Sequence, residues 1–211
     1  MITGTTYIDG FFYLVLAYLL GSIPTSVWVG KLFYGIDVRN SGSGSAGATN
    51  TLRILGYKAA VPVLLFDAFK GWLPVYLGSI SNLFQDNMTM GAFLVVVGLC
   101  AVVGHIFPLF AGFRGGKGVA TLLGIALCLF SREVVVILAL FLLVFLITRY
   151  VSLASITAAM SFPFVTYFIF DNRCLPYLIF AFIVALLVPL THIKNIKRLL
   201  KGEEKKLKLR N

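Results

Sequence analysis

The sequence predicts an all-α integral membrane protein, a bundle of seven transmembrane helices of which some are short. Of its 211 residues, 59% are hydrophobic and only 12% are charged, and the mean hydropathy is +0.95. Apolar stretches of the length that crosses a bilayer as a helix recur along the chain. A soluble domain of this size would need far more polar surface, so these observations exclude the soluble globular class.

Seven apolar segments account for the predicted spans. They are, approximately, residues 11–29, 59–80, 91–110, 118–130, 134–148, 156–170 and 175–191. The fourth would rise only about 20 Å at 1.5 Å per residue, against a hydrocarbon core of about 30 Å. We therefore expect the fourth and fifth segments to be partial or tilted helices inside the bundle. The first ten residues contain no Lys or Arg, which predicts a retained first helix and not a cleaved signal peptide.

The distribution of positive charge predicts the orientation. With seven spans, the odd-numbered connections and the C-terminus share one side, and that side carries 15 of the 18 Lys and Arg residues. The positive-inside rule then places the C-terminus in the cytoplasm and the N-terminus outside. A five-span interpretation without the two short helices gives the same orientation. We predict a single transmembrane domain over residues 1–211, with residues 192–211 as a basic cytoplasmic tail.

The first polar segment on the predicted cytoplasmic side is RNSGSGSAGATNTLR, residues 39–53. Glycine lets a ligand approach the backbone closely, and successive N–H groups in such turns form anion sites. Arg53 can supply a charged fork suited to phosphate. Further side-chain donors are Ser43, Ser45, Thr49 and Asn50. A flexible linker or a close helix contact is the alternative, but hydroxyls alternating with glycine between two arginines favour phosphate binding.

The second polar segment is GHIFPLFAGFRGGKGVAT, residues 104–121. It places His105, Arg114 and Lys117 around a glycine-rich turn that leads into a short helix, and a helix N-terminus is an anion site. A nucleotide-binding P-loop is excluded, because that pattern requires Gly at position 111 and Ser or Thr at position 118, where this chain has Ala111 and Gly118. A purely structural histidine is the alternative for His105.

The third polar segment is THIKNIKRLLKGEEKK, residues 191–206. Its basic residues suit anionic lipid, which is the simpler interpretation. His192 and Asn195, however, are three residues apart and share a helical face at the end of the seventh span. We expect these two side chains to meet Arg53 and Lys117.

Two charged residues lie within the second span. Asp67 and Lys70, in DAFKG, are three residues apart on one helical face, and intramembrane charges usually pair inside the bundle. We predict a structural ion pair, with a role in a substrate path as the alternative. The three cysteines fit neither a metal site nor a disulfide framework and are predicted to be packing residues.

Taken in order, these motifs resemble the bacterial acyl-phosphate:glycerol-3-phosphate acyltransferase family over about residues 13–206. The residues that carry the resemblance are GSIP at 21–24, Arg39 with GSGSAGATN, DAFKG, GHIFPLFAGFRGGKGVAT, RYVSLASI and HIKNIKRLLKGEEKK. The resemblance implies transfer of a fatty acyl group from acyl phosphate to the 1-hydroxyl of sn-glycerol 3-phosphate, giving 1-acylglycerol 3-phosphate and phosphate. It implies no cofactor or metal, a multi-pass protein of the bacterial inner membrane, and an active site on the cytoplasmic side.

The resemblance also implies site residues and partners. It assigns the catalytic role to Ser43, Arg53, Lys117, His192 and Asn195, and substrate binding to Gly42, Gly44, Ser45, Thr49, Asn50, His105, Arg114 and Gly116. Ser45 and Arg114 stand where the family usually has Asn and Lys, and Glu204 matches an acidic position that tethers the tail. The implied partners are the two substrates, membrane lipid and the soluble enzyme that supplies acyl phosphate, with no nucleic acid.

Direct attack by the glycerol 3-phosphate hydroxyl on the acyl carbonyl is the predicted mechanism, with the proton passing to a phosphate oxygen of the acyl phosphate. His192 or His105 as general base is the alternative, and a covalent acyl group on Ser43 or Ser45 is less expected. A membrane transporter of phosphorylated solutes is the competing function class. The polar segments gather on one side, whereas transporter sites usually lie near the midplane. A lipid-binding scaffold would leave these motifs unexplained.

Overall fold

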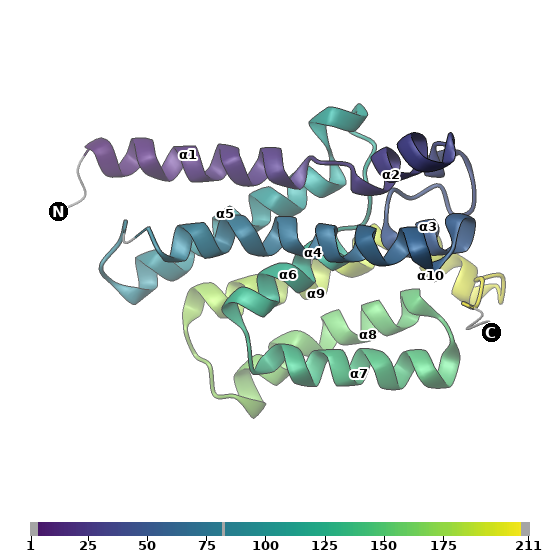
Figure 1. Cartoon of the computed structure of the whole chain (residues 1–211). Coiled ribbons are helices and arrows are strands. Elements are labelled where there is room, and N and C mark those ends of the chain that lie inside the picture. The colour runs from purple at the N-terminus through teal and green to yellow at the C-terminus, as the bar shows by residue number, and fades with distance from the viewer. Residues whose placement is uncertain (1–3, 82, 208–211) are drawn as a thin grey trace. The chain divides into compact units, whose positions relative to one another are not determined.

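A computed structural model describes residues 4–81 and 83–207, and within that range every regular element is a helix (Figure 1). The chain divides into two compact units, Met1–Leu129 and Phe130–Asn211. The prediction of an all-α protein is therefore confirmed for the part of the chain that the structure describes.

The first unit is built on long apolar helices that pack along one another. Its elements are α1 (Gly4–Gly21), α2 (Thr25–Tyr34), η1 (Val38–Asn40), α3 (Ala48–Leu55), α4 (Tyr57–Ser79), α5 (Asn87–Ile106), η2 (Leu109–Ala111) and α6 (Val119–Leu129). Helix α4 contacts α1, α5 and α6, and α1 also packs along α5. The two 3-10 turns and α3 belong to the connections, and these connections carry the polar segments.

Glycines bring the backbones of these helices into contact. A Cβ on Gly21 of α1 would overlap the backbone of α5, and a Cβ on Gly104 of α5 would overlap that of α1. Gly71 and Gly124 do the same between α4 and α6. Small residues at helix crossings are typical of membrane bundles, where close van der Waals packing drives helix association.

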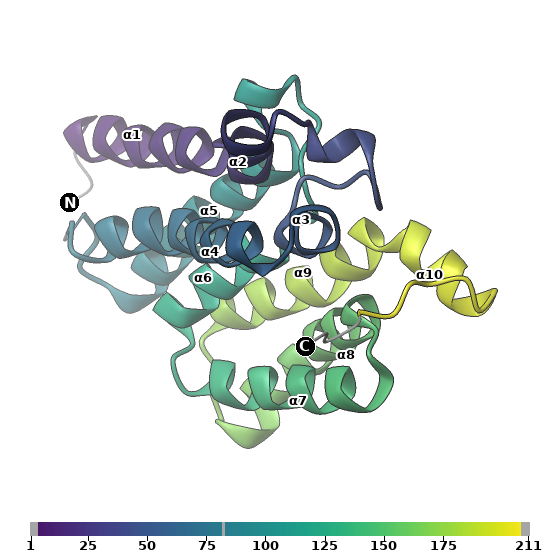
Figure 2. The same cartoon turned by 45° about the vertical axis from the view of Figure 1, so that its right-hand side comes forward.

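The second unit contains a pair of neighbouring helices, α7 (Glu133–Thr148) and α8 (Val151–Phe164), joined by a short turn (Figure 2). Helix α8 continues as the π-helical turn η3 (Val165–Ile169), and α9 (Leu175–Thr191) packs on α8 and leads into α10 (Ile193–Leu200). Buried aromatic rings fill the unit. The Phe130 ring centroid lies 4.9 Å from that of Phe162 and 5.6 Å from that of Phe180.

Within residues 4–81 and 83–207, four segments are long and apolar enough to cross a membrane, by length and composition. They are Ile8–Tyr34, Tyr57–Ser79, Asn87–Ala111 and Val151–Ile169. The pair α9 and α10, bent by 61°, would be a fifth if the two helices form one broken span, whereas α6 and α7 are shorter apolar helices of 11 and 16 residues. The expected shortness of the fourth and fifth segments is confirmed. The count of seven spans and the orientation of the termini stay predictions.

The structure differs from the sequence-based elements at two places. The first predicted segment is two helices, since α1 ends at Gly21 and α2 starts at Thr25. Pro24 lies at the break, and proline lacks the N–H that a continuing helix needs. No helix is predicted within the polar segment 39–53, but α3 begins at Ala48. Gly47 precedes it in extended conformation, and the N–H groups of Asn50 and Thr51 donate to the Gly47 carbonyl.

Candidate active site

The first glycine-rich connection of the first unit is a tight loop, residues 41–47, between η1 and α3. Gly42 and Gly44 have φ of +66° and +72°, in the left-handed region that glycine adopts without strain. A Cβ on Gly42 would also overlap Oδ1 of Asn50. The loop therefore needs glycine at residue 42 for two separate reasons.

Asn50, in the first turn of α3, braces this first loop. Its Oδ1 accepts a hydrogen bond from the Ser43 N–H at 2.8 Å, and its Nδ2 donates to the carbonyls of Val38 at 2.8 Å and Ser41 at 3.2 Å. The side chain is buried, with 2% exposure. Asn50 thus fixes the shape of the loop that leads to Arg53 on the last turn of the same helix.

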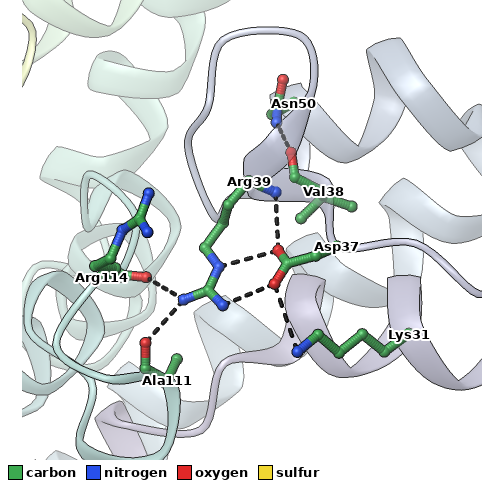
Figure 3. A network of polar contacts seen from close by, with 7 residues as sticks. All are labelled: Lys31, Asp37, Val38, Arg39, Asn50, Ala111 and Arg114. Atoms are coloured by element: carbon green, nitrogen blue, oxygen red, sulfur yellow. Dashed lines mark hydrogen bonds and ion pairs between the residues drawn. The ribbon is translucent and has the colours of Figure 1, made fainter.

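A second polar centre, formed by Asp37 and Arg39, lies beside the first loop (Figure 3). Arg39 donates to Asp37 through Nε at 3.0 Å and through Nη2 at 2.7 Å, and Lys31 approaches the same carboxylate at 3.5 Å. The hydrogen bonds from Arg39 hold the pKa of Asp37 well below its usual range, although partial burial acts in the opposite direction. Hydrogen bonding to Asp37 raises the pKa of Arg39. Both groups are therefore charged at any physiological pH.

The second glycine-rich connection, residues 111–118, is bound back onto the end of α5. The Gly115 N–H donates to the Ile106 carbonyl at 3.1 Å and the Gly116 N–H to the His105 carbonyl at 3.2 Å. This second loop also touches the first, because the Ala46 N–H donates to the Gly115 carbonyl at 3.4 Å. A Cβ on Gly116 would overlap both Nε2 of His105 and the carbonyl of Ala46, so only glycine fits between the two loops.

Beside this junction lies a small cavity of about 10 Å³, room for about one water molecule. Its lining includes Thr25, Asp67, Lys70, His105, Gly115 and Gly116. Lys70 Nζ lies 2.7 Å from Asp67 Oδ1, which confirms the predicted ion pair, and the Thr25 hydroxyl donates to the same oxygen at 3.1 Å. His105 Nδ1 lies 3.7 Å from it. These charged and polar side chains support the second loop, and the cavity between them is too small to hold an acyl chain.

In the second unit, the C-terminal segment folds around Glu204. This buried carboxylate accepts hydrogen bonds from Ser152 at 2.9 Å, Asn195 at 2.7 Å and Arg198 at 2.7 Å. Burial acts to raise the pKa of Glu204, but the three donors together outweigh it and lower the pKa. The tail is thereby bound to α8 and α10.

His192 lies at the bend between α9 and α10, and its ring is fixed by the helix itself. Nδ1 lies 2.7 Å from the Val188 carbonyl. A carbonyl can only accept, so Nδ1 carries a proton, and in the neutral form of the ring Nε2 is the acceptor nitrogen. His192 and Asn195 are both 3% exposed.

The predicted site residues thus fall into two groups. In the first unit, the hydrogen bond between Ala46 and Gly115 joins the two loops. The predicted site residues in these loops or on the helices next to them are Gly42, Ser43, Gly44, Ser45, Thr49, Asn50, Arg53, His105, Arg114, Gly116 and Lys117. His192 and Asn195 belong to the second unit, and their meeting with Arg53 and Lys117 stays a prediction. The sequence-based set did not include Asp37 and Arg39. An acidic residue two positions from an arginine, in a chain with only eight Asp and Glu residues, was the available signal.

Comparison with known proteins gives a consistent result. The family model described as glycerol-3-phosphate acyltransferase matches residues 11–202. The glycerol-3-phosphate acyltransferase of Fusobacterium nucleatum subsp. nucleatum is 46% identical over 198 residues, covering 94% of this chain and 98% of that protein. The one from Chlorobaculum tepidum is 40% identical over 220 residues, covering 92% and 94%.

Solved structures agree with the sequence relatives. The crystal structure of PlsY (YgiH), an integral membrane glycerol 3-phosphate acyltransferase, in its glycerol 3-phosphate form has a TM-score of 0.86 and 38% identity, covering 95% of this chain and 96% of that one. Its lysophosphatidic acid form has a TM-score of 0.84 and 37% identity, with the same coverage. This chain therefore belongs to the glycerol-3-phosphate acyltransferase family of integral membrane proteins.

Proposed function

We propose that this protein transfers a fatty acyl group from acyl phosphate to the 1-hydroxyl of sn-glycerol 3-phosphate. The products are 1-acylglycerol 3-phosphate and inorganic phosphate, and the step begins phospholipid synthesis. Support comes from the family membership and from similar structures solved in a glycerol 3-phosphate form and a lysophosphatidic acid form.

The observation that carries the proposal is the junction of the two glycine loops. Both substrates carry phosphate, and the loops supply backbone N–H groups, hydroxyls and three nearby cations at the ends of apolar helices. Arg53 follows the first loop on α3, and Arg114 and Lys117 belong to the second. Arg114 is exposed, whereas Arg53 and Lys117 are half-buried. Arg53 and Lys117 neutralise the substrate phosphates, and apolar helix surfaces beside them accept the acyl chain.

In the chemical step, the hydroxyl oxygen of glycerol 3-phosphate attacks the carbonyl carbon of the acyl phosphate. The bond from that carbon to the phosphate oxygen breaks, and phosphate leaves with the hydroxyl proton. Acyl phosphate is already activated, so positioning and electrostatic stabilisation of the developing charge suffice. His192 and Asn195 bind phosphate in this proposal, and Ser43 donates a hydrogen bond to phosphate.

A general base is the rival route, and the two histidines differ in their suitability. The side chain of His105 is 5% exposed, with Nδ1 directed toward Asp67. That placement suits support of the second loop better than proton transfer. The Val188 carbonyl keeps a proton on Nδ1 of His192, so Nε2 is the nitrogen of the neutral ring that could accept a proton, and His192 is the better candidate base.

The proposed topology places the loops and the C-terminal segment in the cytoplasm and the N-terminus outside, in a bacterial inner membrane. The positive-inside distribution of Lys and Arg supports this orientation. A cytoplasmic site would receive acyl phosphate from the soluble enzyme that makes it. Labelling of single cysteines at positions 9 and 205, in cells with an intact inner membrane, tests this topology: an impermeant reagent should reach position 9 alone.

Acyl transfer itself is tested with labelled glycerol 3-phosphate and palmitoyl phosphate on the purified protein in lipid. The expected result is label in a lysophospholipid that forms only when both substrates are present. Protein-dependent uptake of label into sealed vesicles, without formation of lipid, would instead support a transporter of phosphorylated solutes and would overturn the proposal.

A further inference from the structure

We propose that Arg39, held in place by Asp37, is a positioning residue that fixes the first glycine loop to the second. For its effect on catalysis this role rests on the proposed acyl transfer, whereas the link between the loops stands on geometry alone. The Arg39 side chain lies between Asp37 and the backbone of Ala111 and Arg114 (Figure 3).

The guanidinium of Arg39 is almost fully used by the protein. Nε and Nη2 donate to the two oxygens of Asp37 at 3.0 Å and 2.7 Å, which is a bidentate arrangement. Nη1 donates to the carbonyl of Ala111 at 2.8 Å and to that of Arg114 at 3.2 Å. Four of the five N–H donors of the group are thus engaged. Arg39 is therefore built to bind backbone and not a phosphate.

These contacts join segments that are 72 and 75 residues apart in sequence. Arg39 is the middle residue of η1 and lies two residues before the first loop. Asn50 fixes the shape of that loop, and Arg53 lies on the same helix as Asn50. Ala111 and Arg114 lie in the second loop, and Lys117 follows three residues later. One side chain therefore links the segment that leads to Arg53 on α3 with the loop that bears Lys117.

Without Arg39, the contact between the loops would be weak. The Ala46 N–H to Gly115 carbonyl hydrogen bond is 3.4 Å long, near the limit for such a bond. The Arg39 contacts with the second loop are shorter and involve a charged donor, which makes them about twice as strong as neutral ones. We therefore expect the spacing between the loops to loosen when the guanidinium is removed.

Asp37 orients the guanidinium, and its contribution depends on limited solvent access. The side chains of Arg39 and Asp37 are 15% and 13% exposed. A lysine at position 39 could reach the carboxylate or a carbonyl, but a single ammonium cannot present parallel donors to Asp37 while also bonding two carbonyls. Arginine is therefore required at this position for geometry and not only for charge.

The chain contains its own matched control. Asp171 and Arg173 have the same spacing, with Arg173 Nε 2.6 Å from Asp171 Oδ1. Their side chains are 74% and 69% exposed, however, and such surface pairs contribute little. Arg173→Met removes a guanidinium from an aspartate two residues away without touching either loop.

The experiment compares wild-type protein with Arg39→Lys, Arg39→Met and Arg173→Met, each as the full chain in lipid nanodiscs. Hydrogen–deuterium exchange reports on residues 41–47 and 111–118 separately, and steady-state kinetics give kcat and KM for glycerol 3-phosphate. For Arg39→Met we expect exchange in both loops to rise about tenfold and KM to rise at least tenfold, more than kcat falls. Arg173→Met should match wild type.

If Arg39→Met does not fold, Arg39→Lys still tests the proposed role of Arg39. We expect its unfolding midpoint to stay near that of wild type while exchange over residues 111–118 rises and KM increases several-fold. Wild-type KM in Arg39→Lys, or unchanged exchange over residues 111–118 in the folded variants, would overturn the proposal. Loosened loops in the variants of a protein that makes no lysophospholipid would support the link and refute only the proposed function.

Discussion

Asp67 and Lys70 form an ion pair of 2.7 Å on α4, with each side chain only 2% exposed. Lys70 also donates to the carbonyl of Ile23 at 2.7 Å, at the break between α1 and α2. Thr25, at the start of α2, donates to Asp67 at 3.1 Å. The pair therefore ties α4 to the broken first span beside the two glycine loops, and a buried charge there is unfavourable unless it is paired.

Lys70→Met should lower the free energy of unfolding by about 3–5 kcal/mol, because it leaves the Asp67 carboxylate buried without its cation. Thermal unfolding of the purified protein in detergent measures the loss. The exposed Lys58, on the first turn of the same helix, provides the control Lys58→Met, which should change little. The double variant Asp67→Asn with Lys70→Met should recover most of the loss. A double variant as unstable as Lys70→Met would contradict the pairing.

Gly42→Ala should destabilise the first loop and reduce activity. A left-handed conformation costs a residue with a Cβ about 1–2 kcal/mol, and here the Cβ would also displace Oδ1 of Asn50. We expect KM for glycerol 3-phosphate to rise about tenfold or more. Gly10→Ala is the control: a Cβ there meets only Phe93 at 3.9 Å, and alanine favours the helix by about 0.5–1 kcal/mol. Equal kinetics for Gly42→Ala and wild type would rule out this role of the loop shape.

Glu204 should make the free energy of unfolding depend on pH in the acidic range. Its folded-state pKa lies below the ordinary value of 4.5, so its stabilisation is complete above about pH 4.5 and is lost as the pH falls through the folded value. The unfolding midpoints of wild type and Glu204→Gln should therefore differ most near pH 7 and converge as the pH falls below 4.5. Glu203→Gln, at an exposed neighbour, should follow wild type. A constant gap between the two curves down to pH 3 would contradict this account.

Replacing each histidine by glutamine separates the two routes for the proton. If the phosphate of acyl phosphate accepts it, His192→Gln should raise KM while kcat falls by less than about tenfold, and His105→Gln should act mainly on stability. A general base is typically worth about 10²–10⁴ in rate. Pre-steady-state acyl transfer at saturating substrate measures this step. A loss of that size with binding intact would assign the base role to the histidine that was replaced.

The regular elements could be predicted from the sequence where apolar length and local spacing determine them. The 13-residue apolar segment 118–130 is too short to span a bilayer as a helix, and the corresponding helix α6 has only 11 residues. The Asp67–Lys70 pair followed from an i, i+3 spacing on a helix that had to bury both charges. Such features depend on residues within one or two helix turns of each other, so they can be predicted from a single sequence.

The break after Gly21 and the start of α3 at Ala48 were not predicted. Pro24 lies within the longer apolar stretch 11–29, which hides the interruption, while α3 is too short and too polar to give an apolar period. The contacts of Arg39 with Ala111 and Arg114 join residues more than 70 positions apart. Only the fold brings these three residues together, so the sequence alone did not distinguish Arg39 from the other cations near glycine-rich segments.

Release of phosphate from palmitoyl phosphate, measured together with lysophospholipid formation, tests the central claim most directly. Purified wild-type protein, Arg53→Ala and the exposed-site control Arg132→Ala would each be assayed with and without sn-glycerol 3-phosphate. We predict equimolar phosphate and lysophospholipid from wild type and Arg132→Ala, only when glycerol 3-phosphate is present, and at least a hundredfold loss in Arg53→Ala. Phosphate release by folded wild-type protein that is independent of glycerol 3-phosphate and yields no lysophospholipid would contradict the account.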